Sequence, residues 1–425
     1  MRRIANHRAG ARLRGALACV LCLAAHATIR AQTPTDTPAP QPAAAGLSFE
    51  QIYELAARDN LQVNAVRQRR AVAEADVLIA GQRPNPEFIA GYTRSEPRLN
   101  YSVSQPVELG GKRARRIEVA RNELRLTELD VDAALRTLRR DVRAAYFNLA
   151  LARNTRDTGR QAVDEAKALA DLARARFEAG DIAQFEVLQA DLAVARATND
   201  LARLENAERV TRAGLNQLLN RAADAPLDLR DSLFGPPAPV ATSELINRSL
   251  AQNVELRTVE QQIATEESRL RLARAQRVPD LLLEPGVESI DPSLPNNYGF
   301  KMQVTVPLPL FNRGRGELAR SNALIAQLRA ERDAARQRIS AEIGQAALRL
   351  DYAREQLAFY ETRLLPDAER VRQLANESYR AGQTSLLAVI DAARNAREVR
   401  QGYLQALFDY QAALADLEQA AGVRL

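Results

Sequence analysis

Two stretches of this chain are too long and too free of proline to belong to an ordinary globular core. There is no proline between Gly111 and Ala179, and only Pro366 interrupts the stretch from Gly316 to Ala381. Because an α-helix rises about 1.5 Å per residue, the first stretch would extend on the order of 100 Å. Helices in globular proteins average only about 10–14 residues. The sequence therefore predicts coiled-coil rods or the wall of a tube.

The apolar residues of the first stretch follow heptad spacing. The recurring positions are Leu124, Val131, Leu138 and Ala145, each seven residues after the last, with Leu135, Val142 and Leu149 four places after their partners. This a/d spacing is typical of helices that pack along their length. An ordinary two-stranded coiled coil would show the same heptads.

The chain repeats one plan twice, on either side of a break from Ala222 to Thr242 that contains Pro226, Pro236, Pro237 and Pro239. ARFEAGDIAQFEVL, from Ala175, matches SYRAGQTSLLAVI, from Ser378, and VSQPVELGGKR, from Val103, matches VTVPLPLFNRG, from Val304. The offset is about 201 residues in both matches, which indicates an internal duplication. Each half is predicted to run short helix, helix, strand, strand, very long helix, glycine turn, long helix.

The predicted organisation has five parts. They are a signal peptide at 1–31, a Pro- and Ala-rich linker at 32–46, a first structural repeat at 47–221, an inter-repeat linker at 222–242 and a second repeat at 243–425. The long hairpins are expected at 111–219 and 316–421.

The first residues have the pattern of a secretory signal. Five arginines between Arg2 and Arg14 precede an apolar run from Ala16 to Ala25, and cleavage is expected after Ala31. An alternative is lipidation of Cys19, which follows Ala16, Leu17 and Ala18 as in an imperfect lipobox.

Removal of that segment changes the charge and the available chemistry. It carries six arginines and no acidic residue, so without it the number of basic residues falls from 59 to 53 and equals the 53 acidic residues. The net charge of the remaining chain then gives no support to nucleic-acid binding. The removed segment also carries both cysteines and both histidines, at Cys19, Cys22, His7 and His26. Tetrahedral zinc sites, cysteine nucleophiles and Ser-His triads are thereby excluded. We expect no enzyme, no cofactor and no metal site.

Four short segments in which apolar residues alternate with polar or small residues interrupt the helical pattern. They are Glu87 to Thr93, Asn100 to Val107, Leu281 to Ser289 and Tyr298 to Val306, and turn-forming residues separate each pair. Phe88, Ala90 and Tyr92 give the first segment an apolar face. Four strands cannot close a membrane barrel, which needs about eight, and lipid does not tolerate open edges. Three copies would supply enough strands, whereas two surface hairpins capping a soluble bundle are the plainer alternative.

The glycine turns within RFEAGDIAQFEVLQA and YRAGQTSLLAVIDA, together with the strand exit QPVELGGKR, resemble the outer-membrane efflux protein family typified by TolC. The resemblance extends from about Leu47 to Gly422. The strand exit looks like the heavy-metal and cation efflux branch, the CzcC and CusC type.

The resemblance implies a mostly α fold with a small β part, as a trimeric 12-stranded outer-membrane β-barrel continued by a periplasmic α-helical barrel. It also implies the partners: two further copies of the chain, a periplasmic adaptor, an inner-membrane pump of the resistance-nodulation-division class, and outer-membrane lipid. The protein would lie in the cell outer membrane and extend into the periplasm.

The resemblance further suggests where the pore narrows. Family members close at helix hairpins near the glycine turns, with rings of acidic side chains, and the positions that match are Glu186, Gln189 and Asp391. Three such carboxylates around a constriction would attract cations. The alternative is that they are solvated charges near helix starts, where negative charge is favourable.

This sequence departs from the TolC pattern close to the expected gate. Ala388 stands where the pattern has an aspartate, and Thr384 stands where it has a basic residue. The ionic tether that the family pattern implies near Tyr379 therefore does not carry over to this chain.

Glycines mark the predicted turns and bends. Gly180 and Gly382 are expected at the tube tip, where a chain reversal needs positive φ. Gly110 and Gly111 are expected to bend the chain from strand to helix. The basic residues that follow, Lys112, Arg113, Arg115 and Arg116, could bind phosphate at a helix start, but we expect them to face the inner membrane boundary or the pore.

These observations predict a passive outer-membrane duct of a tripartite efflux system for metal cations or other small toxic molecules. A periplasmic coiled-coil adaptor is the alternative, since it would also have a signal peptide and long helical hairpins. Adaptors normally flank one hairpin with compact β domains, whereas this chain has two hairpins and four strand segments.

Overall fold

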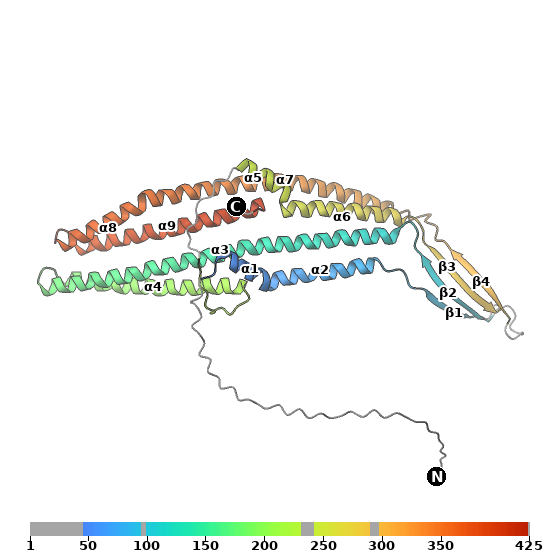
Figure 1. Ribbon diagram of the computed structural model, residues 1–425, viewed down its shortest axis with the longest axis horizontal. Helices are drawn as coiled ribbons and strands as arrows, with labels where there is room; N and C mark the ends of the chain where they lie inside the picture. Colours follow the sequence, from blue (N-terminus) through green and yellow to red (C-terminus); the bar gives the residue numbers. More distant parts are fainter. Residues whose placement is uncertain (1–45, 95–98, 231–241, 290–296, 424–425) are drawn as a thin grey trace, which may run out of the picture. The chain divides into compact units, whose positions relative to one another are not determined.

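The computed structural model describes residues 46–94, 99–230, 242–289 and 297–423. The predicted signal peptide, the linker up to residue 45 and the prolines at 236, 237 and 239 lie outside these ranges. The described part is mostly helical with one small antiparallel sheet, which confirms the predicted fold class (Figure 1).

The elements follow the same order in both halves. The first half contains α1 (Phe49–Asp59), α2 (Leu61–Ala80), β1 (Glu87–Tyr92), β2 (Leu99–Val107), α3 (Lys112–Glu178) and α4 (Gln184–Leu218). The second contains α5 (Thr242–Gln252), α6 (Val254–Gln276), β3 (Leu281–Ser289), β4 (Tyr298–Thr305), α7 (Arg315–Phe359), the π-helical segment η1 (Tyr360–Leu364), α8 (Leu365–Arg380) and α9 (Leu386–Ala421).

Matching asparagines start the second helix of each half. The Asn60 side chain accepts hydrogen bonds from the first turn of α2, and Asn253 does the same for α6. Asparagine is favoured there because its short amide satisfies N–H groups that lack a partner within the helix. The same amides donate to the backbone oxygens of Leu218 and Ala420, at 3.1 and 3.2 Å. Each cap therefore ties the start of one helix to the end of that half's last helix.

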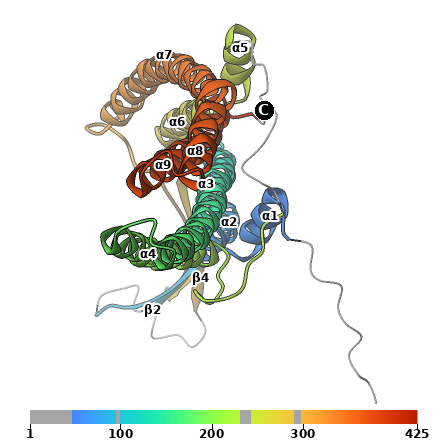
Figure 2. The same cartoon turned by 90° about the vertical axis from the view of Figure 1, so that its left-hand side faces the viewer.

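Helix α3 is the central element of the described residues. It packs against α1, α2, α4, α6 and α9, and Figure 2 shows the hairpins side by side when viewed end on. Among the predicted heptad positions, Leu138, Val142 and Leu149 are buried, and they belong to a core with Tyr146 and Leu215. A second core lies between α5, α6, α7 and α9, and a third lies near the hairpin ends around Tyr379. The other four positions are half-buried, so the heptads bury their apolar positions only in part, in contacts among several helices.

The four strands form one sheet in the order β1-β2-β3-β4. The register places Ala90 opposite Tyr101, Tyr101 opposite Val287 and Val287 opposite Phe300. On the neighbouring rung Ile89, Ser102, Gly286 and Lys301 are aligned. Since successive residues of a strand point to opposite faces, one face is predominantly apolar and the other is more polar.

The second long helix contains a π-helical segment that α3 lacks. Pro366 follows the segment directly, and in a regular α-helix it would lack an N–H and its ring would crowd the carbonyl of Thr362 one turn earlier. The repeat spacing also grows there by one residue, since Pro106 matches Pro307 before the segment whereas Gly180 matches Gly382 after it. The π turn accommodates this additional residue without interrupting the helix.

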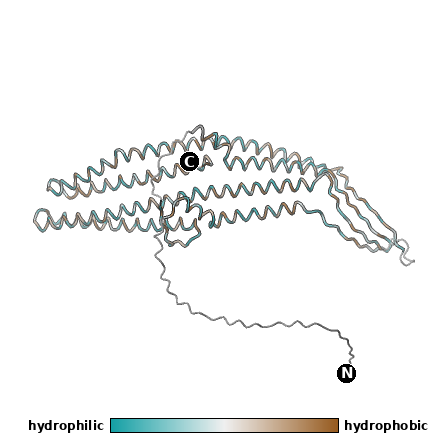
Figure 3. Tube along the Cα trace, viewed as in Figure 1, coloured by the Kyte–Doolittle hydropathy of each residue, from teal (hydrophilic) through white to brown (hydrophobic). Residues whose placement is uncertain are grey.

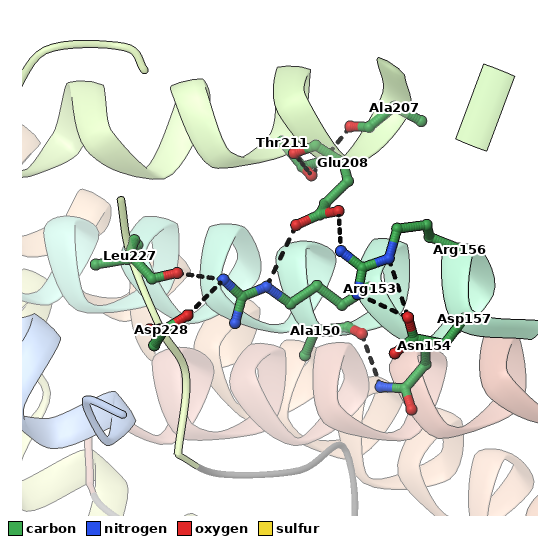
Figure 4. Close-up of polar contacts among 10 residues, drawn as sticks. All are labelled: Ala150, Arg153, Asn154, Arg156, Asp157, Ala207, Glu208, Thr211, Leu227 and Asp228. Atoms are coloured by element: carbon green, nitrogen blue, oxygen red, sulfur yellow. Dashed lines mark hydrogen bonds and ion pairs between the residues drawn. The ribbon is translucent and has the colours of Figure 1, made fainter. Parts of the chain in front are cut away.

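The start of the inter-repeat segment is fixed to the first hairpin. Leu47 and Leu229 form a parallel bridge, and the Tyr146 hydroxyl donates to the Leu47 oxygen. Figure 4 shows Glu208 of α4 between Arg153 and Arg156 of α3, at 3.5 and 2.5 Å. Arg153 also donates to the Leu227 oxygen. The buried Glu208 carboxylate therefore organises two arginines, one of which holds the segment in place.

Apolar and polar residues alternate closely along the described helices, as Figure 3 shows. None of the helices within the described residues combines the length and apolar character needed to cross a membrane.

Candidate functional site

The two long hairpins turn at Gly180 and Gly382. Both residues have positive φ, +80° and +69°, a region that side chains with a Cβ disfavour. Backbone hydrogen bonds close each turn, from the Asp181 nitrogen to the Arg176 oxygen and from the Gln383 nitrogen to the Ser378 oxygen. The two turns are thus built in the same way.

An arginine of the first hairpin holds the second near its turn. The Arg176 Nη1 donates to the Tyr379 backbone oxygen at 3.0 Å, and the guanidinium lies 4.9 Å from the centre of the Tyr379 ring. Such cation–π contacts contribute about 0.5–2 kcal/mol. Arg176 therefore supplies a link at the predicted gate that does not need a basic residue at position 384.

Glu186 lies next to Tyr379 and does not line the groove that holds the other two constriction candidates. The Tyr379 side chain is buried, and burial together with the Glu186 carboxylate raises the pKa of its hydroxyl despite the nearby Arg176. Both the Tyr379 hydroxyl and Oε2 of Glu186 are buried without a hydrogen-bond partner among the described residues. One carboxylate oxygen of Glu186 is therefore shielded, while the residue as a whole is half-buried.

Gln189 and Asp391 lie on one groove between α3, α4 and α9. The groove has a volume of about 610 Å³. Its charged lining comprises Asp200, Asp391 and Glu398 together with Arg196, Arg203, Arg394 and Arg397. Asp391 is exposed, and the ion pair between Arg394 and Glu398 measures 2.9 Å. The groove therefore mixes both signs of charge around the exposed Asp391 carboxylate.

The strand-to-helix bend of the first half has positive φ at Gly110 and Gly111, +71° and +69°. A Cβ on Gly110 would lie 3.0 Å from the Val278 Cβ, so this position also needs a small residue because the segment at the end of α6 passes close by. The second half makes the corresponding bend with Gly314, at φ +66°.

Three members of the basic cluster have partners within the chain, and the first of them is buried and does not face the pore or the membrane boundary. Lys112 is buried and its Nζ lies 2.7 Å from Asp280, which also accepts a hydrogen bond from the Leu109 nitrogen. Arg116 pairs with Glu108, and Arg113 donates to the Gly81 oxygen. A cluster of like charges in the sequence gave no sign of these partners because Asp280 is far away along the chain.

Two contacts near the predicted sites could not be identified from the sequence. The only available signal for Arg176 was its place one turn before Gly180, and the signal for Asp280 was its place just before a predicted strand. Among the described residues no cluster of acidic, histidine or cysteine side chains has the arrangement of a metal site.

Comparison with known proteins supplies the family. Residues 52–221 and 245–423 match the family model described as outer membrane efflux protein. The cobalt-zinc-cadmium resistance protein CzcC of Cupriavidus metallidurans is 27% identical over 382 residues, which is 88% of this chain and 90% of that protein. The nickel-cobalt-cadmium resistance protein NccC of Alcaligenes xylosoxydans xylosoxydans is 29% identical over 298 residues, 66% of this chain and 65% of that protein.

Solved structures share the fold. A crystal structure of CusC superposes with a TM-score of 0.71 at 18% identity and covers 89% of this chain and 93% of that one. The outer membrane protein VceC from Vibrio cholerae superposes with a TM-score of 0.70 at 18% identity and covers 88% of this chain and 96% of that one. The family model spans both repeats, and this chain therefore belongs to the outer membrane efflux protein family.

Proposed function

We propose that this chain is one of three subunits of an outer-membrane channel that serves a tripartite efflux system as a passive duct for metal cations. The observation that carries the proposal is the family match across both repeats, together with two paired long hairpins and one open four-stranded sheet. The family is one of efflux proteins, which confirms the expectation that the chain is not an enzyme.

Assembly into a trimer is supported by the sheet itself. Strands β1 and β4 are its edges, and an exposed edge carries unpaired N–H and C=O groups. A membrane-embedded sheet has to close so that these groups are satisfied. Three copies would join edge to edge into a twelve-stranded barrel, with the helical hairpins continuing it into the periplasm.

The proposed cargo follows from the relatives. The printed names of CzcC and NccC describe resistance to cobalt, zinc, cadmium and nickel. Two other relatives, both named pyoverdine export outer membrane protein OpmQ, are 24% and 26% identical, so the family also serves organic cargo. A duct does not need metal ligands, because a passing ion only has to be admitted.

We place the constriction at the hairpin ends, with Asp391 and Gln189 in the groove and Glu186 beside Tyr379. The proposal rests on the shared groove and on the exposed Asp391 carboxylate. Three symmetry-related copies of Asp391 would favour cations. The arginines of the same groove reduce that preference, so we expect Asp391 to modulate selectivity and not to determine it alone.

The adaptor alternative is disfavoured by the extent of the match. Both repeats belong to the family model, and the chain covers 90% of CzcC. The adaptor and the inner-membrane pump are therefore proposed as separate partners that meet the hairpin ends.

The function can be tested by planar-bilayer recording of the purified protein. We expect single-channel steps with a preference for cations, and Asp391→Asn should reduce the cation-to-anion permeability ratio. A matched control is Asp333→Asn on α7, which removes an exposed carboxylate outside the groove. Well-folded protein that gives no steps would contradict the channel, whereas steps with unchanged selectivity in Asp391→Asn would contradict only the constriction.

The cargo needs a second experiment. A host that lacks this chain but keeps its pump and adaptor should grow poorly with cobalt, zinc or cadmium, and the chain should restore growth. Restored resistance to organic compounds alone would move the cargo to that class.

A further inference from the structure

The chain leaves the sheet differently in the two repeats. After β2 it reaches the left-handed Gly111 that starts α3, and after β4 it reaches the left-handed Gly314 that starts α7. Four residues separate Pro106 from Gly111, whereas six separate the corresponding Pro307 from Gly314. The second exit is therefore longer by two residues, and we call residues 308–313 the exit loop.

The first exit is closed by contacts within the chain. Lys112 pairs with Asp280, which also accepts a hydrogen bond from the Leu109 nitrogen at 3.0 Å. Arg116 pairs with Glu108. The Leu109 side chain is half-buried. Charged and apolar groups of the first exit are therefore partnered in the same chain.

The exit loop, by contrast, holds three large apolar side chains in the open. Leu308, Leu310 and Phe311 are 72%, 63% and 101% exposed. The loop is nevertheless shaped by its own hydrogen bonds. The Leu310 nitrogen donates to the Leu308 oxygen at 2.9 Å, and the Gly314 nitrogen donates to the Asn312 side-chain oxygen at 3.0 Å. Adjacent exposed apolar side chains on an ordered turn mark a surface that contacts something apolar.

The exit loop continues the apolar face of strand β4. Met302, Val304 and Val306 are alternate, exposed residues, and Leu308 is the next residue in this alternation. Strand β4 ends at Thr305, so the apolar alternation extends beyond the strand. In the proposed barrel this face meets lipid, and the hairpins start on the periplasmic side. The exit loop therefore lies where the apolar face reaches the periplasmic edge of the membrane.

Three arginines surround the end of the exit loop. Arg313 and Arg315 flank Gly314, and a Cβ on Gly314 would lie 3.3 Å from the Cγ of Arg277. The Arg277 side chain therefore lies against the same glycine. All three arginines are exposed, and they have no ion-pair partner among the described residues.

The acid that balances the first exit has no counterpart in the second. Glu108, two residues after its proline, pairs with Arg116, whereas Pro309 stands at the same place in the exit loop. Glu317 is the one acidic residue between positions 306 and 320, and it is exposed. The second exit therefore keeps an excess of positive charge beside its apolar side chains.

We propose that the exit loop, with Arg277, Arg313 and Arg315, binds an anionic phospholipid of the periplasmic leaflet. Guanidinium groups bind phosphate oxygens through charge and paired N–H donors, and exposed apolar side chains enter the acyl boundary. An arginine near an anionic membrane surface favours it by about fivefold.

The inference rests on the proposed outer-membrane channel and adds to it a headgroup site in the second repeat. A lipid is the occupant because one phospholipid carries both an apolar chain and a negative phosphate, and the exit loop presents the complement of each side by side. Coverage of the loop by the next copy is the alternative that the experiment separates.

Tryptophan fluorescence can locate the exit loop, because the chain contains no tryptophan. The Phe311→Trp channel is placed in vesicles of phosphatidylcholine and phosphatidylglycerol, one of which carries bromine near the top of its acyl chains. Bromine quenches tryptophan on contact, so this variant should lose most of its fluorescence. The loss should be larger with brominated phosphatidylglycerol than with an equal mole fraction of brominated phosphatidylcholine. Phe177→Trp, 43% exposed beside the first hairpin turn, is the matched control and should lose little with either lipid.

Arginine variants test the headgroup contact. In the Phe311→Trp background, replacing Arg277, Arg313 and Arg315 by Gln should remove the preference for phosphatidylglycerol, while quenching by both lipids remains. Arg336→Gln is the control, because it removes an exposed arginine about 30 Å further along α7. Single-channel conductance shows that each variant has assembled.

A preference for phosphatidylglycerol that the three arginine substitutions remove supports the site. Quenching without that preference, or a preference that survives the substitutions, overturns it. Conducting Phe311→Trp channels that are not quenched place the loop against water or the next copy, which overturns the site and leaves the proposed function standing. Leu310→Trp serves as the probe if Phe311→Trp does not assemble. Absence of conductance in the wild-type protein overturns the proposed function itself.

Discussion

Helices α4 and α9 occupy the same place in the two repeats, yet they pack with different chemistry. The spacing that relates Gly180 to Gly382 makes Glu208 the counterpart of Tyr410. Both side chains are buried, but Glu208 is held by Arg153 and Arg156, whereas Tyr410 belongs to an apolar core with Leu414 and Leu417. Helix α9 packs against α3, α7 and α8 of its own chain, while α4 packs mainly on α3. The neighbouring helices, and not the duplicated plan, therefore determine which side chain fills a position.

The largest expected effect on the free energy of unfolding comes from removing the Glu208 carboxylate. Glu208→Ala would leave two partly buried arginines without their shared carboxylate and should lower the free energy of unfolding by about 3 kcal/mol. The matched control is Tyr410→Phe, which should change it by less than about 0.5 kcal/mol because the Tyr410 hydroxyl has no hydrogen-bond partner among the described residues. Denaturant unfolding in detergent measures both. Equal losses in the two variants would show that the ionic and apolar cores are equivalent.

A smaller effect distinguishes the helix contacts of the two hairpins. A Cβ on Gly402 of α9 would lie 2.5 Å from the Tyr360 hydroxyl and close to two ring carbons, whereas a Cβ on Gly159 of α3 would meet one methyl of Leu204 at 2.6 Å. A leucine methyl moves more easily than a packed ring, and alanine favours helix by about 0.5–1 kcal/mol over glycine. Gly402→Ala should therefore lose about 1–2 kcal/mol, while Gly159→Ala should be close to neutral. The same unfolding measurement applies, and the reverse order would refute the tighter contact in the second hairpin.

At the hairpin ends the two repeats are joined by Arg176. Arg176→Ala should cost about 1 kcal/mol at most, because the contact lies near the ends of the helices. Its clearest result should be faster amide hydrogen exchange around both turns, with no change in the sheet. Arg174→Ala is a suitable control, since Arg174 pairs with Asp191 within the first hairpin. Similar exchange in both variants would mean that Arg176 does not link the turns.

The smallest effect is a dependence on alkaline pH that only the second hairpin should show. Burial and the hydrogen bond to Glu361 raise the pKa of Tyr403 to about 12. The folded protein then keeps this proton while the unfolded chain releases it, so stability falls as pH rises from about 10 to about 12. Tyr403→Phe should make the melting temperature less sensitive to pH in that window. An unchanged slope would assign the alkaline loss to other groups.

Much of the fold could be predicted because its signals are local. Proline-free heptads indicated the long helices, and turn residues separated the strands to within a residue of β1 through β4. Gly180 and Gly382 could be placed because a positive φ limits the residue types that a turn accepts. These features depend on neighbours in the sequence, so the sequence alone displays them.

Features that depend on distant partners could not be predicted. The pairing of Lys112 with Asp280, and the position of Arg176 over Tyr379, join residues from different repeats. Glu186 and Asp391 looked alike in the sequence, but only Asp391 lies on the groove while Glu186 lies at Tyr379. The π segment was also missed, because Pro366 signals a disturbed helix without saying whether the helix bends, ends or takes up one more residue.

The π segment Tyr360–Leu364 has its main consequence in rotation. One added residue lengthens a helix by only about 1.5 Å but turns everything beyond it by about 100°. Had the residue been added as ordinary α-helix, Tyr379 would face a different direction from the one in which Arg176 meets it. Because the π turn is wider, the additional residue is accommodated without rotating α8 about its axis. The side chains at the ends of the two hairpins therefore keep the directions in which they meet.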